Sequence, residues 1–250
     1  MKKSASLIIG FTALATIILI VIVYFIVGAL SPISLAKMYE NVNSNISMKY
    51  YIKNYEKNKN INNLYAVVDK SISMDKDDVL IEYYPSLLQD EGYTELINNV
   101  NELNYDENAS VKQNLFLSNE DNRLKTRYVS ALSEQDTIKA FEFAYDDFKN
   151  NTDNFAFIGL RNVIESIISM FDNNVVNGIV NRFNDLIDEY DTIKNNQDVS
   201  TYEKAYQCYN CLEICQFILL LGDNNINIID SDIFNQHKSN LATDLSIYIL

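Results

Sequence analysis

The strongest constraint on this chain is a run of 24 residues without a charged side chain, from Leu7 to Leu30. As an α-helix rising about 1.5 Å per residue, the run is roughly 36 Å long and can cross a hydrocarbon core of about 30 Å. Water is absent from that core, so a single span must pair all its backbone groups internally, which only a helix does. Residues 7–30, with Leu7, Ile17, Ile22 and Leu30 among them, are therefore predicted to form a membrane anchor.

The charges on the two sides of this run predict its orientation. Lys2 and Lys3 precede the run, whereas the first acidic residue, Glu40, lies ten residues beyond it. The positive-inside bias then keeps residues 1–6 in the cytoplasm and sends residues 31–250 across the cell membrane as one extracytoplasmic domain. A cleaved signal peptide is the alternative, but its apolar core is usually only about 7–15 residues long. A single-pass anchor is the favoured interpretation.

Composition and charge exclude several classes of function. Residues 31–250 carry 34 acidic and 18 basic side chains, a net charge of −16, which repels nucleic acid. The chain has 6 Gly and no Gly-rich phosphate loop, and its one His excludes most His-dependent triads and multi-His zinc sites. We therefore expect a protein that is not an enzyme and needs no cofactor. The 33 Asn residues are interpreted as the drift of an AT-rich genome and not as a sign of chemistry.

Apolar residues recur with helical spacing along nearly the whole exported part. A capping box, Ser200 and Glu203, marks one helix start, and Gly222 is expected to end that helix. Pro85 is expected to interrupt the helix that begins at Asp77. The predicted helices cover residues 34–41, 45–58, 61–74, 77–84, 94–103, 123–132, 134–149, 155–171, 174–193, 200–221 and 231–250, with a weak polar stretch at 104–122. With breaks of a few residues between them, they predict an all-α fold of antiparallel hairpins.

Two hairpins carry residues at tetratricopeptide-like offsets. In the first, Leu35, Ala36 and Tyr39 are followed by Met48, Ile52 and Tyr55; in the second, Leu124 and Tyr128 are followed by Thr137, Phe141 and Ala144. Over about 60 residues the chain resembles tetratricopeptide-like helical repeat proteins. The resemblance implies a solenoid that binds peptides and partner proteins in a concave groove. An irregular helical bundle is the alternative.

Three cysteines form the most distinctive cluster of reactive side chains. Cys208, Cys211 and Cys215 share about 60° of arc on one helix. With His237 as a fourth ligand they are candidates for a metal site, and as a thiol pair for a redox site. The third interpretation, which we favour, is that they are small apolar residues packed between helices. A metal or redox module is therefore the alternative function.

Clustered tyrosines are the candidate contacts for a partner. Tyr50, Tyr51, Tyr55, Tyr83 and Tyr84 are large aromatic side chains of the kind that anchor protein interfaces. About half of each cluster must face a core. The favoured function is a membrane-anchored helical scaffold that binds protein partners in a cell-envelope complex. A small-molecule binder is a further possibility, if a cavity lies between the helices.

Overall fold

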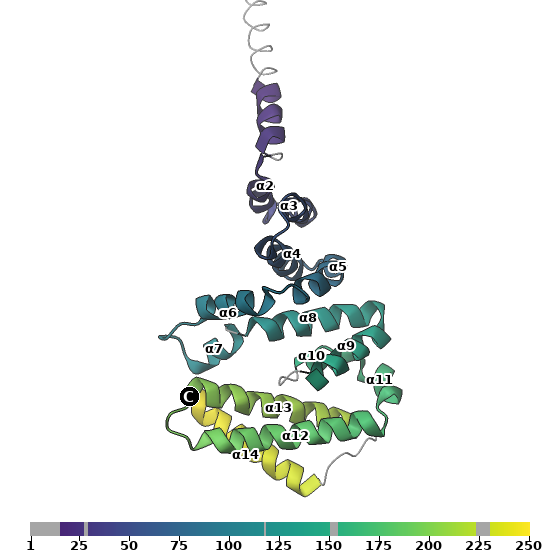
Figure 1. Cartoon of the computed structure of the whole chain (residues 1–250), viewed down its shortest axis with the longest axis vertical. Helices are drawn as coiled ribbons and strands as arrows, with labels where there is room; N and C mark the ends of the chain where they lie inside the picture. The colour runs from purple at the N-terminus through teal and green to yellow at the C-terminus, as the bar shows by residue number, and fades with distance from the viewer. Residues whose placement is uncertain (1–15, 28–29, 118, 151–154, 224–230) are drawn as a thin grey trace, which may run out of the picture. The chain divides into compact units, whose positions relative to one another are not determined.

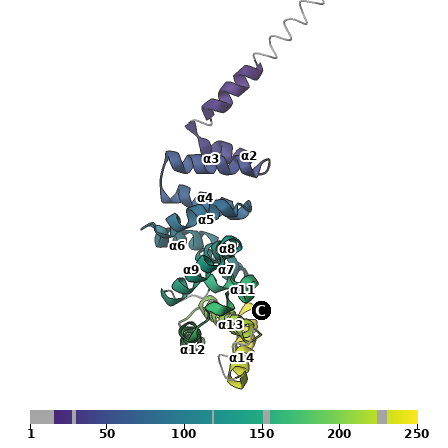
Figure 2. The same cartoon turned by 90° about the vertical axis from the view of Figure 1, so that its right-hand side faces the viewer.

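The structure is a computed structural model that describes residues 16–27, 30–117, 119–150, 155–223 and 231–250 (Figures 1 and 2). Among these residues the regular structure is helical throughout and includes no strand, which confirms the all-α prediction. The chain divides into two compact units, residues 1–90 and 91–250. Helices that follow one another along the chain pack as adjacent pairs within each unit.

The described part of the apolar run forms the helix Thr16–Val27. Its large apolar side chains are exposed around the whole circumference, with Ile17 at 58% and Ile22 at 49% exposure, and Leu30 beyond it is 73% exposed. No single described helix is long and apolar enough to span a membrane; Thr16–Val27 and Pro32–Tyr39, bent by 113°, pass that test only as a pair. Such a segment fits a membrane span and a signal sequence alike. Leu7 lies outside the described residues.

The first unit continues with two helical hairpins. Ser47 Oγ donates a 2.7 Å hydrogen bond to the Ala36 carbonyl, and a 2.9 Å bond joins the Asn54 and Asn63 side chains. One buried cluster of this unit consists of Ala36, Met48, Tyr51 and Val67. The helices are α2 Pro32–Tyr39, α3 Ser44–Lys57, α4 Ile61–Ser73 and α5 Asp77–Leu88.

The second unit is larger and has α8 and α13 at its centre. Helix α8 contacts α6, α9 and α10, whereas α13 contacts α7, α10, α12 and α14. The elements are α6 Tyr93–Asn104, α7 Val111–Leu117, α8 Glu120–Gln135, α9 Thr137–Asn150, α10 Phe155–Ile158, the 3₁₀ turn η1 Arg161–Val163, α11 Ile164–Ile167, the 3₁₀ turn η2 Ile168–Met170, α12 Asn173–Lys194, α13 Thr201–Asp223 and α14 Ser231–Ile249.

Side chains at the breaks cap the helices that follow. Asn43 and Asn60 accept from the backbone N–H groups of Ile46 and Asn63 at 3.1 and 2.9 Å. Ser200 and Glu203 exchange hydrogen bonds, which confirms the predicted capping box. These bonds satisfy N–H groups that have no partner inside a helix. Some of the abundant Asn residues therefore have a structural role that composition alone does not reveal.

Four helix predictions were wrong in detail. The polar stretch 104–122 contains α7 and the start of α8. Helix α13 runs through Gly222 to Asp223. Helix α5 passes Pro85 by one turn, because the fully buried Leu87 anchors that turn and Gln89 N–H donates to the Pro85 carbonyl at 3.2 Å.

The fourth error concerns residues 155–171, predicted as one helix and observed as α10, η1, α11 and η2. This segment is apolar at most positions but also carries Arg161, Asn162 and Glu165. Its breaks let Phe157 contact Phe148 and Phe217, while Phe171 contacts Phe141 and Phe217, with ring centroids 4.8–5.9 Å apart. The segment therefore buries side chains against both α9 and α13.

Gly159 sits at the first of these breaks, directly against α8. A Cβ atom there would lie 2.7 Å from the Thr126 carbonyl oxygen and 2.9 Å from Val129 Cβ. Both are closer than normal contacts, and the carbonyl belongs to the α8 backbone. Only a residue without a side chain allows this approach.

Gly159→Ala is expected to destabilise the chain by about 1–3 kcal/mol, because the added methyl group pushes α10 away from α8. Gly178→Ala is the matched control. Its Cβ would meet only Tyr145 Oη, at 3.7 Å, inside α12, so this variant should be stabilised by about 0.5–1 kcal/mol. Urea unfolding of both variants measures the difference. Equal effects would contradict the close packing at Gly159.

Candidate functional site

A groove of about 380 Å³ runs along one face of α8 in the second unit. Leu115 of α7, Ile158 of α10 and Tyr209 of α13 line it beside α8. Most of the remaining lining is polar and comes from a single helix stripe. The lining residues are Leu115, Asn119, Asn122, Arg123, Thr126, Arg127, Ser130, Ile158 and Tyr209.

The polar stripe follows from the spacing of residues along α8. Its members stand at positions 119, 122, 123, 126, 127 and 130, the three- and four-residue steps that share a helix face. Residues of the opposite side, such as Leu124, Tyr128 and Leu132, are buried in the core. From the sequence this stripe resembles an ordinary solvated face. It becomes a groove because α10 and α13 contribute to its walls.

Charged groups at the start of α8 hold the groove in place. Arg123 donates two hydrogen bonds, of 2.7 and 2.6 Å, to the buried carboxylate of Glu120. Lys125, only 4% exposed, lies 2.7 Å from an Asp121 oxygen and 3.1 Å from an Asp147 oxygen. The groove therefore presents two guanidinium groups in a strongly acidic protein.

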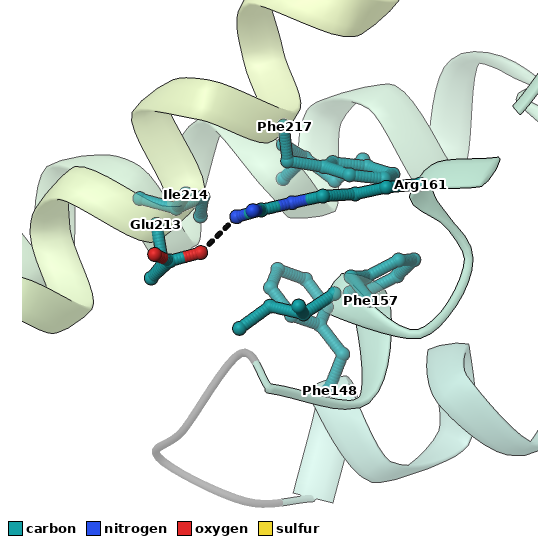
Figure 3. A pocket seen from close by; sticks show the side chains of 8 residues that line it. Phe148, Phe157, Arg161, Glu213, Ile214 and Phe217 are labelled. Atoms are coloured by element: carbon teal, nitrogen blue, oxygen red, sulfur yellow. Dashed lines mark hydrogen bonds and ion pairs between the residues drawn. The ribbon is translucent and has the colours of Figure 1, made fainter. Parts of the chain in front are cut away.

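Another ion pair lies beside the groove, between Arg161 of η1 and Glu213 of α13. Figure 3 shows Arg161 between the rings of Phe217 and Phe157, with its guanidinium directed at Glu213. The cavity here is about 10 Å³, room for one water at most. Burial lowers the pKa of Arg161, and it raises the pKa of the neighbouring Tyr209, which stays a neutral phenol. The pair fastens the broken segment to α13 and leaves no space for a ligand.

The three cysteines are fully buried in α13 and their thiols are not oxidised. Cys208 donates to the Leu241 carbonyl of α14 at 3.2 Å, whereas Cys211 donates to the Leu186 carbonyl of α12 at 3.3 Å. Burial raises the pKa of Cys208 and Cys215 to about 12 and raises that of Cys211 as well. They occupy two helix seams as packing residues.

His237 lies between α12 and α14, with its ring edge-on to Phe183 at 6.0 Å. It lines a small cavity with Tyr190 and Asp244, which are joined by a 2.8 Å hydrogen bond. Within the described ranges, no three His, Cys, Asp or Glu side chains are placed to hold a metal ion. The structure thus provides no geometry for the metal site considered from the sequence.

The candidate tyrosines divide into two groups. Tyr51 and Tyr84 are buried, at 3% and 0% exposure, so neither has surface to offer a partner. Tyr50, Tyr55 and Tyr83 are half-buried, and the rings of Tyr55 and Tyr83 pack edge to face at 6.0 Å. Of the five tyrosines predicted to contact a protein partner, only Tyr50, Tyr55 and Tyr83 therefore keep exposed surface.

We expect the native thiols to be unreactive toward Ellman's reagent at pH 8. Raised pKa values keep them protonated at that pH, and burial blocks access to them. All three should react once the chain is unfolded in guanidinium. The exposed control Lys139→Cys should gain one fast-reacting thiol in the folded protein. Rapid reaction of any native thiol would revive the redox interpretation.

Comparison with protein families, curated protein sequences and solved structures finds no match to this chain.

Proposed function

We propose that this chain is a membrane-anchored helical adaptor. Its second unit would bind an extended, carboxylate-bearing segment of a partner protein in the α8 groove, outside the cytoplasm. The observation that carries the proposal is the groove itself, a polar stripe with two arginines between walls from three other helices. The resemblance of the α2–α3 and α8–α9 hairpins to tetratricopeptide-like units supports the same kind of function.

The shape of the groove favours an extended peptide over a compact small molecule. From Asn119 to Ser130 the stripe advances about 16 Å, at roughly 1.5 Å per helical residue. An extended chain covers that length with about five residues, at about 3.3 Å each. Asn119, at the start of the stripe, has a side-chain amide of the kind that pairs with a peptide backbone. Arg127 supplies the planar donor pair that carboxylates prefer.

The proposal of a membrane anchor is supported by the apolar surface of the helix Thr16–Val27. Nine consecutive or nearly consecutive apolar side chains, from Ile17 to Ile26, are between 46% and 68% exposed. In water such a surface is unfavourable, and in a bilayer it is the expected one. Tethering would confine the groove near the membrane and raise its effective concentration for membrane-bound partners.

Photo-crosslinking tests the groove in cells. A photoreactive residue at Ser130 should give a discrete adduct whose crosslinked peptide contains Asp or Glu. Arg127→Gln should reduce the adduct tenfold or more, because a hydrogen bond to a charged group contributes about 1.5–3 kcal/mol. The same photoreactive residue at the exposed Lys139 of α9 is the matched control. Equal adducts from both positions, or a peptide without an acidic residue, would contradict the proposed groove function.

The anchor and its orientation are tested separately. Ile17→Lys with Ile22→Lys should release the protein from membranes washed at alkaline pH, because each buried Lys costs about 2.5–3.5 kcal/mol. Ser34→Lys with Asn41→Lys adds the same charge at exposed positions and should have no effect. Protease added to intact cells should digest residues 31–250. Digestion only after lysis would show the opposite orientation, with residues 31–250 in the cytoplasm. A mature chain that begins near residue 30 would show that the apolar run is a cleaved signal peptide.

A further inference from the structure

The charge of the chain changes sign directly after the apolar run. Residues 31–60 carry five Lys and two Glu, a net charge of +3. Residues 61–250 carry 13 basic and 32 acidic side chains, a net charge of −19. The basic charge is therefore concentrated in the first hairpin, α2–α3, and in the few residues after it.

Three of these lysines lie on one face of α3. Lys49, Lys53 and Lys57 are four residues apart, so they project from the same side of the helix, and all three are exposed. The buried residues of α3, among them Met48 and Tyr51, are on the opposite side. Lys53 Nζ also lies 5.9 Å from the centroid of the Tyr50 ring. Helix α3 therefore has a basic outer face bordered by an aromatic side chain.

Hydrogen bonds hold α3 close to the end of the apolar run at two points. Tyr50 Oη lies 2.8 Å from Tyr24 Oη, and Lys57 Nζ donates to the Leu30 carbonyl at 3.0 Å. The Tyr39 ring of α2 stacks on Tyr50 at 6.4 Å and meets Tyr24 edge to face at 6.5 Å. Tyr side chains favour the boundary between lipid tails and water. If Thr16–Val27 is in a bilayer, α3 must lie at its surface.

We propose that the α2–α3 hairpin docks on the membrane surface through its lysines, which bind anionic lipid head groups. This inference rests on the proposed anchor but not on the α8 groove. Positive charge next to a membrane span is attracted by the negative surface potential of anionic lipid, and the attraction falls off within a Debye length. The remaining, acidic part of the chain is repelled by the same surface. The hairpin would thus be the lipid-binding part, and the acidic part would be held away from lipid.

The test uses the full chain in nanodiscs of phosphatidylcholine, with or without a quarter of phosphatidylglycerol. Acetylation rates of individual lysines are measured by mass spectrometry. Lys49 and Lys53 should react about fivefold more slowly in the anionic discs than in the neutral discs, because each docked Lys gains about one factor of five. Lys112, Lys139 and Lys149, exposed in the second unit, are internal references and should not change. The protection should disappear in about 1 M salt.

Variants with reversed charge form the second part of the acetylation experiment. Lys49→Glu with Lys53→Glu should remove the anionic-lipid protection of Lys37 and Lys57, whereas Lys139→Glu with Lys149→Glu should leave it. Equal rates in both lipids, with the chain still resistant to alkaline extraction, would overturn the docking while the anchor survives. The lysines would then face something other than lipid, such as an acidic protein. Loss of the chain on alkaline extraction would instead overturn the anchor itself and the docking with it.

Discussion

The second unit depends on the approach of residues 155–171 to α8, which the missing side chain of Gly159 allows. This contact brings Ile158 to the edge of the polar stripe and places Arg161 beside Glu213. It also carries Phe157 and Phe171 into the aromatic contacts with α9 and α13. Core packing and the shape of the groove therefore have a common origin. A change that moved α10 outward would open the wall of the groove and loosen the core at once.

Much of the fold was predictable because helical periodicity is a local signal. The spacing of Leu64, Val67 and Val68, for example, gave the core face of α4, and Ser200 with Glu203 gave the start of α13. The two hairpins with repeat-like offsets are present as packed pairs, α2 with α3 and α8 with α9. A tetratricopeptide family assignment does not follow from this, because paired helices with buried Leu, Ala and Tyr occur in many helical folds.

The features that were missed depend on contacts between distant residues. Residues 155–171 are rich in apolar side chains, and local periodicity therefore predicted one long helix. The breaks reflect neighbours on both sides, which the sequence does not show. The α8 stripe was missed for a similar reason, since Asn119 and Arg127 are ordinary surface residues until Ile158 and Tyr209 stand beside them. For the cysteines the sequence suggested a site that the structure does not form. Their spacing indicated shared chemistry, but Cys208 and Cys211 donate hydrogen bonds to different helices.

Helix α8 presents the groove on one side and core residues such as Leu124 and Tyr128 on the other. Filling the groove and unfolding the second unit are therefore linked equilibria. A compound that occupies the groove at about a hundred times its dissociation constant would add about 2.7 kcal/mol to the stability of that unit. Melting curves measured with candidate peptides would therefore show which of them binds the folded second unit.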